Sequence, residues 1–268
     1  LCTLMERFNV IQPSAVLAPY VKHYWLLESD DVINSQRVIP TGNIELLFHR
    51  GYPMKRNGQM IPITSLSGQS LSYADLIPTG TVNMIAVVFH PFGAKAFFEF
   101  PVYELSNLIV SADELGIDPL RELEDKILNT ADDNVCIHLI ESFLINRLNP
   151  FKEYNYKRMV ATVGSINLCD VELSVSRLAE TVCLSKKQFQ RIFNEHIGAT
   201  PKEFMRIVRF HKALYTLQNN PTMSFTTLAY ECGYYDQAHM TNEFKLFSGY
   251  TPSQYVAICA PHSDYFSY

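Results

Sequence analysis

The strongest constraint on the fold of this chain is a repeat within its second half. Leu178-Ala179 recurs 50 residues later as Leu228-Ala229. Beyond that pair the offset is 51, and four features recur in the same order: an aromatic residue, a glycine, a Thr-Pro pair and a second aromatic residue. The first copy has them at Phe193, Gly198, Thr200-Pro201 and Phe204, and the second at Phe244, Gly249, Thr251-Pro252 and Tyr255. Self-similarity over several tens of residues marks copies of one supersecondary unit. We therefore expect two similar structural units in this half.

Each copy has the pattern of two helices separated by a short turn. Ser174, Ser185 and Ser224 stand just before apolar residues at helical spacing, where a hydroxyl group caps the first turn of a helix. The turn falls at Cys183-Leu184 in the first copy and at Gly233 in the second. The predicted inner faces are Leu178, Ala179, Val182, Phe189, Ile192 and Phe193, and then Leu228, Ala229, Cys232, Met240, Phe244 and Phe247. This pattern predicts helix-turn-helix units over about 174–198 and 224–249.

A further helix is predicted after the glycine that ends each copy. In Thr200-Pro201-Lys202-Glu203 a hydroxyl group stands at the cap, proline at the first helical position and a carboxylate at the third, which forms a capping box. Thr251-Pro252-Ser253-Gln254 repeats this arrangement with glutamine. The first of these helices keeps one face through Phe204, Ile207, Val208, His211, Leu214 and Leu217. We expect it to span about 201–218 and to join the two units.

Two helix-turn-helix units on a stiff connector are suited to binding duplex DNA. Each unit braces one helix against the backbone and presents the second to the major groove, and successive major grooves on one face lie roughly 34 Å apart. The outer face of the first presented helix carries Lys186, Lys187, Gln190, Arg191 and Asn194. Glutamine and arginine make bidentate contacts with adenine and guanine edges. The alternative is an all-helical bundle in which the capping boxes only set helix ends.

Residues from about 155 to 258 resemble the DNA-binding domain of the AraC/XylS family of bacterial transcription regulators. The second copy carries the residues of the family signature: Ala229, Gly233-Tyr234, Phe244-Lys245, Gly249, Thr251-Pro252 and Tyr255. The chain departs from the family at Met240, where an aromatic residue is usual, and at Cys183, where glycine is common. If the turn requires a positive φ, cysteine destabilises it by about 1 kcal/mol.

The resemblance implies which residues read DNA bases. Carried over by position, these are Lys187, Gln190 and Arg191 in the first unit and Gln237, Ala238 and Asn242 in the second, with His239 and Thr241 beside them. Family members usually recruit RNA polymerase and activate transcription, so the resemblance also implies double-stranded DNA and the polymerase as partners.

Charge is distributed unevenly along the chain. The net charge of −5 divides into −7 for residues 1–150, with 10 basic and 17 acidic residues, and +2 for residues 151–268, with 12 and 10. Residues 174–215 carry +5, whereas residues 221–260 carry −2, with Lys245 as their single basic residue. Because phosphate neutralisation dominates DNA affinity, we predict that the first unit supplies most of the binding energy.

The front half has the pattern of a small β-rich domain followed by helices. Apolar stretches separated by turn residues lie at 21–27, 44–48, 61–66 and 82–89, and helices are expected over 92–100, 120–128 and 134–148. The segments Pro19–Trp25 and Phe89–Leu105 resemble a sensory domain of some family members, often a cupin-like barrel. We therefore expect an α+β chain, with a sensory or dimerisation domain at 1–150 and a DNA-binding domain at 151–268.

The front half offers a candidate effector pocket but no pattern typical of an enzyme. Tyr24, Trp25, Phe97 and Phe98 are the aromatic residues that would line such a pocket, although such residues more often form a plain core. His23, Glu45, His49 and His90 are metal-ligand types without the spacing of a metal site. No phosphate-binding loop or nucleophile elbow is present. We expect no catalytic residue, no metal and no cofactor.

Cysteine spacing and hydropathy narrow the class further. The six cysteines lie apart, so we expect reduced thiols and not a zinc or disulfide framework, which argues against a cysteine-dependent DNA repair enzyme. Neither a signal peptide nor an apolar run of membrane-spanning length is evident, which predicts a cytoplasmic protein.

Two modes of control remain open. The front half either binds a small-molecule effector, or binds no small ligand and serves only for dimerisation or for capture by another protein. A cavity with apolar walls favours the first, and a flat apolar face favours the second.

Overall fold

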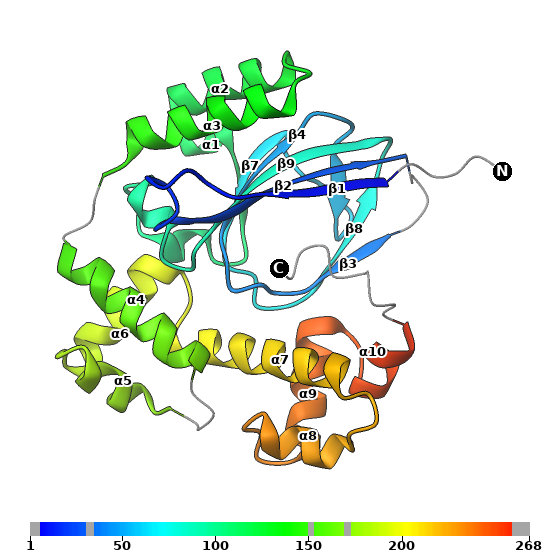
Figure 1. Ribbon diagram of the computed structural model, residues 1–268, viewed down its shortest axis with the longest axis vertical. Coiled ribbons are helices and arrows are strands. Elements are labelled where there is room, and N and C mark those ends of the chain that lie inside the picture. The colour runs from blue at the N-terminus through cyan, green and yellow to red at the C-terminus, as the bar shows by residue number, and fades with distance from the viewer. Residues whose placement is uncertain (1–5, 31–34, 150–152, 169–172, 259–268) are drawn as a thin grey trace.

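A computed structural model describes residues 6–30, 35–149, 153–168 and 173–258, and confirms the α+β class. The front half is β-rich, and the back half is helical (Figure 1). None of the helices in these ranges is both long and apolar enough to cross a membrane.

The front half contains two antiparallel sheets. A six-stranded sheet has the order β1-β2-β9-β4-β7-β10, and a four-stranded sheet has the order β3-β8-β5-β6. The strands are β1 (Glu6–Ile11), β2 (Val21–Ser29), β3 (Gln36–Val38), β4 (Glu45–His49), β5 (Met54–Arg56), β6 (Gln59–Met60), β7 (Thr64–Ser67), β8 (Ala74–Pro78), β9 (Val82–Phe89) and β10 (Ile109–Ser111). No described strand of one sheet pairs with a strand of the other, so two open sheets stand where the sequence suggested a cupin-like barrel.

Alternation along the central strands divides the front half into two cores. Successive side chains on a strand point to opposite faces, so Tyr24 packs on one side of the large sheet and Trp25 on the other. The first core is covered by α1 (Ala112–Leu115), α2 (Asp118–Leu128) and α3 (Asp133–Arg147), of which α2 and α3 lie side by side over the sheet (Figure 1). The second core lies between the two sheets.

One expected helix of the front half was wrong. Residues 92–100 form only a single 3₁₀ turn, η1 (Ala94–Ala96), and a second turn, η2 (Val102–Leu105), follows it. Phe97 and Phe98 are buried in the first core. Their packing against the sheet, and not a helical pattern of apolar residues, determines the conformation of this segment.

The back half consists of two helix-turn-helix units joined by one long helix, as expected from the repeat. Its helices are α4 (Glu153–Leu168), α5 (Val175–Thr181), α6 (Lys186–Ile197), α7 (Pro201–Asn219), α8 (Phe225–Glu231), α9 (Gln237–Ser248) and α10 (Pro252–Ile258). The first unit has a core with Leu178, Phe189 and Phe193. The second has a core with Leu228 and Phe244. Helix α7 contributes buried side chains to both cores and crosses between the units (Figure 1).

The turn of the first unit has the backbone conformation that favours glycine. Cys183 has φ 55°, and Gly233 in the equivalent turn of the second unit has φ 77°. Cys183 is exposed, whereas Cys136 and Cys232 are buried; the other three cysteines lie outside the described residues.

Candidate nucleic-acid interface

Helix α6 presents a polar face to solvent on a firmly packed base. Ser185 accepts a hydrogen bond from the backbone N–H of Gln188, whose side chain accepts in return, so a capping box fixes the start of the helix. Phe189, Ile192 and Phe193 are buried on the inner face. On the other side the predicted DNA-reading residues Lys186, Lys187, Gln190 and Arg191 are exposed, and Asn194 is half-buried.

Helix α9 is the equivalent helix of the second unit. Asp236 caps it by accepting a hydrogen bond from the backbone N–H of His239. Gln237, Ala238 and Asn242 are exposed. His239 and Thr241 are half-buried, and the Thr241 hydroxyl group donates back to the Gln237 carbonyl oxygen at 2.8 Å. Three of the five predicted residues on this helix are therefore exposed, and the Gln237 side chain accepts a hydrogen bond from the Thr226 hydroxyl group at 2.8 Å.

The two presented helices open onto one groove along α7. Its lining includes Lys186 from α6, Lys202 from α7, and His239 and Asn242 from α9. Positive side chains from two elements thus lie between the predicted base-reading helices, where phosphate groups are favoured.

A buried carboxylate fixes α9 to α7. Glu243 has a side chain that is 4% exposed, and its Oε1 accepts hydrogen bonds from Arg206 Nε at 2.6 Å and Arg209 Nη2 at 3.1 Å. His239 Nε2 lies 3.6 Å from the same oxygen. The sequence pointed to this network only indirectly, because Glu243 is a charged residue on the apolar face of Met240 and Phe247.

The pairing of Glu243 bears on the net charge of −2 that residues 221–260 carry. The Glu243 carboxylate pairs with Arg206 and Arg209 of α7, and the Asp236 carboxylate caps α9, so each of these acidic groups has a partner within the domain. The −2 of residues 221–260 therefore overstates repulsion of DNA, although Lys245 remains their only basic residue.

The front half contacts the end of each presented helix. Gly198 and Gly249 end α6 and α9 with φ of 82° and 76°. A Cβ atom on Gly198 would lie 3.0 Å from the Val102 carbonyl oxygen, and one on Gly249 would lie 2.5 Å from Arg37 Nη1. Equivalent positions of the repeat are therefore both covered by the front half.

Arg37 makes the most elaborate of these contacts. Its guanidinium lies between the rings of Tyr73 and Tyr250, 4.2 and 4.6 Å from their centroids. It donates to both carboxylate oxygens of Asp75 and, through Nη1, to the Ser248 carbonyl oxygen at the end of α9 at 3.3 Å. A cation stacked on aromatic faces and near a helix C-terminus is held by both interactions.

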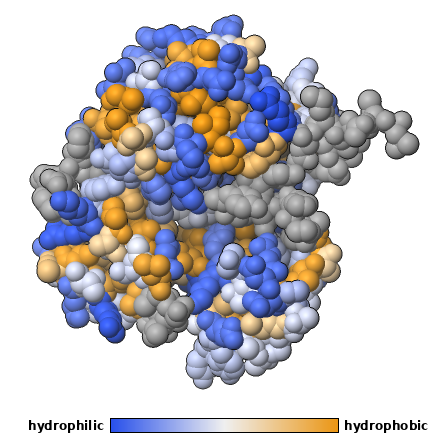
Figure 2. All heavy atoms as spheres, in the orientation of Figure 1, coloured by the Kyte–Doolittle hydropathy of each residue, from blue (hydrophilic) through white to orange (hydrophobic). Residues whose placement is uncertain are grey.

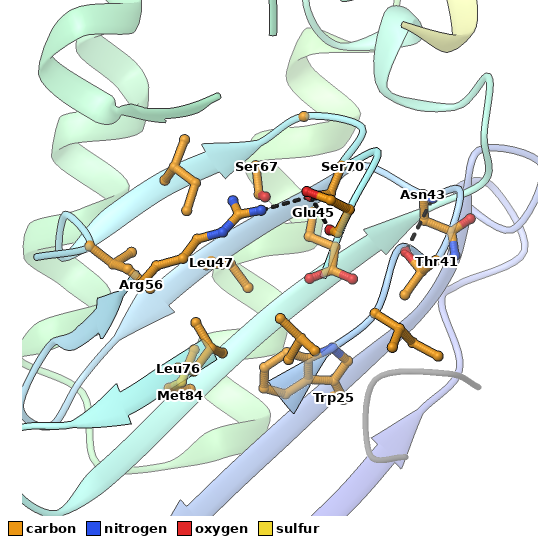
Figure 3. A pocket seen from close by; sticks show the side chains of 16 residues that line it. Trp25, Thr41, Asn43, Glu45, Leu47, Arg56, Ser67, Ser70, Leu76 and Met84 are labelled. Atoms are coloured by element: carbon orange, nitrogen blue, oxygen red, sulfur yellow. Dashed lines mark hydrogen bonds between the residues drawn. The ribbon is translucent and has the colours of Figure 1, made fainter. Parts of the chain in front are cut away.

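The loop after β3 has one side toward the helical half and the other toward a cavity. On the first side, His211 Nε2 of α7 lies 2.6 Å from the Pro40 carbonyl oxygen, and Gly42 lies against Phe204. On the second side, Ile39 and Thr41 line a cavity between the two sheets that is open to solvent (Figure 3).

The structure does not bring the four aromatic residues of the expected effector pocket together. Trp25 lines the cavity between the sheets. Tyr24, Phe97 and Phe98 are buried in the core on the opposite face of the large sheet, because strand alternation separates Tyr24 from its neighbour. The cavity instead includes Glu45 and Arg56, which face each other across it in Figure 3.

Burial shifts the pKa values of the ionisable groups in this region. Burial raises the pKa of Glu45 to about 7, and it lowers those of His23 and His49 to about 4. It also lowers the pKa of His90. Among the described residues, no three His, Cys, Asp or Glu side chains are grouped as metal ligands would be.

Two family models match this chain, one in each half. Residues 9–111 match a domain of unknown function (DUF6597). Residues 178–257 match a helix-turn-helix domain. The C-terminal part is an AraC/XylS-type DNA-binding domain.

Several transcription regulators are similar to part of this chain. The arabinose operon regulatory protein of Escherichia coli K12 is 25% identical over 131 residues, which cover 47% of this chain and 44% of that protein. An uncharacterized HTH-type transcriptional regulator of Haemophilus influenzae is 26% identical over 155 residues, 58% of this chain and 52% of that protein. The HTH-type transcriptional activator RhaS of Enterobacter sp. 638 is 29% identical over 83 residues, 31% and 30% of the two chains. The aligned region thus spans about half or less of each of these relatives.

Solved structures that resemble this chain are more distant in sequence. ToxT from Vibrio cholerae O395 is 9% identical, with a TM-score of 0.46 over 95% of this chain and 97% of that chain. A regulator with an AraC-type DNA-binding domain from Chromobacterium violaceum is 21% identical, with a TM-score of 0.31 over 33% of this chain and 80% of that chain.

Proposed function

We propose that this AraC-type regulator binds a specific DNA sequence by placing α6 and α9 in successive major grooves. Lys187, Gln190 and Arg191 would read one site, and Gln237, Ala238 and Asn242 would read the next. Lys186, Asn194, His239 and Thr241 would lie beside them. The observation that supports this assignment is the exposure of side chains with hydrogen-bonding groups on two equivalent helices whose inner faces are buried.

The first test selects bound duplexes from a random pool with the whole chain at near-physiological salt. We expect a motif with one strong element and a weaker one about one helical turn, roughly 10 bp, away. Failure to enrich any sequence, both with the whole chain and with residues 151–268 alone, would contradict sequence-specific binding.

The second test compares the two helices on the selected sequence. Lys187→Ala is expected to weaken binding by about tenfold or more and Asn242→Ala by less, because Lys187 also brings a positive charge to the phosphate backbone. Lys126→Ala on the exposed side of α2 removes the same charge far from the groove and is the matched control. Equal losses for Lys187→Ala and Asn242→Ala would contradict the asymmetry.

We propose that the front domain, residues 1–150, controls DNA binding by the second domain, residues 151–268. Support comes from its contacts with the ends of both α6 and α9, since a shift of this domain changes how those helices are held. The cavity between its sheets favours an effector over a partner protein. On the face in Figure 2, apolar atoms are interrupted by hydrophilic ones and form no continuous flat patch.

The remaining part of the proposal concerns the cellular role. We assign the chain no catalysis, and propose that it acts in the cytoplasm as an activator that contacts RNA polymerase, with homodimerisation as a possible second level of control. A reporter with the selected sequence upstream of a weak promoter tests this role. Expression is expected to rise with the regulator present, and a fall would indicate a repressor.

A further inference from the structure

The cavity between the sheets has a polar wall on two neighbouring strands of the large sheet, β4 and β7. His23, Val88, Glu45 and Ser67 are successive partners across β2, β9, β4 and β7, so all four side chains point to the same face of the large sheet. The Glu45 and Ser67 side chains line the cavity. This row places a carboxyl group beside a hydroxyl group at the cavity wall.

The Glu45 carboxyl group has no partner within the described part of the protein. Lys22 and Arg56 influence it electrostatically, but neither lies within the 4.0 Å of an ion pair, and no described residue donates a hydrogen bond to it. Glu45 keeps some contact with solvent through the cavity while protein surrounds it. A carboxyl group in such a position is satisfied by water or by a ligand that donates a hydrogen bond.

Arg56 supplies the opposite chemistry from the second sheet. Its Nη2 donates to the Ser70 hydroxyl group at 2.7 Å, and its other N–H groups donate to no described residue (Figure 3). A guanidinium with free N–H groups is suited to a carboxylate, which it binds through two parallel hydrogen bonds. With Lys22 nearby, the basic groups outnumber Glu45, so an acidic ligand is favoured over a basic one.

Another part of the cavity wall is apolar. Trp25 and Leu47 of the large sheet, Leu76 of the small sheet and Met84 lie around its inner end (Figure 3). All four are buried, so this end suits the hydrocarbon part of a small molecule.

We propose that the cavity binds a small amino acid or hydroxy acid with an apolar side chain. Its carboxylate group would accept hydrogen bonds from Arg56, its amino or hydroxyl group would donate to Glu45, and its side chain would lie against Trp25 and Leu47. This inference rests on the proposed function only in its second step, in which the bound acid alters DNA binding.

That second step depends on two segments that lie between the cavity and the helical half. Val38 lines the cavity while its neighbour Arg37 contacts the end of α9. Ser72 lines the cavity while Tyr73 stacks on the same arginine. Ile39 belongs to both sides, since it lines the cavity and packs against the core of the second unit. Filling the cavity therefore acts on the contact that holds α9.

Calorimetry on the full chain without DNA tests the binding step. The probes are the apolar proteinogenic L-amino acids and their 2-hydroxy acid counterparts. Each probe is compared with two truncated analogues: the matching amine or alcohol, which lacks the carboxylate group, and the matching carboxylic acid, which lacks the amino or hydroxyl group. We expect at least one amino or hydroxy acid to bind, and both truncated analogues to bind at least tenfold more weakly. No binding by any of the amino or hydroxy acids, or equal binding by a truncated analogue, would overturn the proposal.

Variants locate the site. Arg56→Met and Glu45→Gln are each expected to weaken binding of the best probe at least tenfold, whereas Arg121→Met on the exposed surface of α2 leaves it unchanged. Circular dichroism and thermal unfolding show whether each variant is folded. If Arg56→Met does not fold, Leu76→Phe narrows the apolar end instead and is expected to exclude the larger probes first. Unchanged affinity in folded Arg56→Met or Glu45→Gln would overturn the assignment.

The regulatory step has a separate readout. Affinity for the selected duplex is measured with and without the best probe, in the parent chain and in Arg37→Ala. A change of at least threefold in the parent, reduced in Arg37→Ala, is expected. Probe binding with unchanged DNA affinity would overturn the coupling alone, and probe binding by a chain that selects no DNA would overturn the proposed function alone.

Discussion

Cys183 shows how one residue can carry strain that its structural equivalent avoids. At φ 55° a residue with a Cβ atom is less stable than glycine by about 1–2 kcal/mol. Replacing it with glycine also increases the chain entropy of the unfolded state, which offsets about 0.5–1 kcal/mol of that gain in stability. We predict that Cys183→Gly raises the free energy of unfolding by about 0.5–1 kcal/mol in urea with reductant present. Cys183→Ala, which removes the thiol and keeps the Cβ atom, is the control. Equal stabilities of the two variants would contradict a backbone origin.

Glu243 is the residue on which the position of α9 depends most. Glu243→Gln leaves Arg206 and Arg209 without their anionic partner inside the domain, so we predict a loss of about 2 kcal/mol in the free energy of unfolding. Glu231→Gln on the exposed end of α8 makes the same chemical change outside the network. The two variants are compared by urea unfolding, and a loss no larger than that of Glu231→Gln would show that the network adds no net stability.

For single residues, the sequence predicted which side chains are exposed better than it predicted which side chains pair with each other. The outward positions of Lys187, Gln190 and Arg191 follow from helical periodicity, which is a local property. The pairing of Glu243 with Arg206 and Arg209 joins residues 34 to 37 positions apart, and no local pattern encodes it. The same limit applies to Glu45 and Arg56, which become neighbours only when two sheets pack.

Among the elements, α7 is the one whose start the sequence defines most sharply. The Thr200 hydroxyl group accepts from the Glu203 backbone N–H, and the Glu203 carboxylate accepts from the Thr200 backbone N–H at 2.8 Å. We predict that Thr200→Ala lowers the free energy of unfolding by about 1 kcal/mol. Thr222→Ala, in the exposed turn before α8, is the control for losing a threonine side chain. Equal stabilities of the two variants, compared by thermal and urea unfolding, would argue against the cap.

Prediction at the scale of elements succeeded where the signal was repeated or strongly periodic. The repeat predicted α5, α6, α8 and α9, and apolar runs predicted β2, β4 and β9. Short strands such as β3 and β5, with three residues each, have too few positions for alternation to be recognised. The helix expected over 92–100 was wrong because Phe97 and Phe98 are buried by packing against the sheet, which no local pattern encodes.

For the whole molecule, the contact between Arg37 of the front half and the end of α9 is one that a single substitution removes. We predict that Arg37→Ala speeds amide hydrogen exchange in the last turn of α9 and in α10 several-fold, because the Ser248 carbonyl oxygen loses its external donor. Exchange in α5 and α6 is expected to stay the same. Arg121→Ala is the matched control, and unchanged exchange at α9 would mean that other contacts suffice to hold it.

The two-sided loop after β3 has a consequence for how the regulator responds inside a cell. Coupling between two binding sites is reciprocal: whatever factor the effector adds to DNA affinity, DNA adds to effector affinity. A tenfold factor corresponds to about 1.4 kcal/mol. Molecules already bound at a target sequence would therefore respond at a different effector concentration from molecules free in solution. A single polypeptide would then have two sensing thresholds, set by where it is located and not by any change in its sequence.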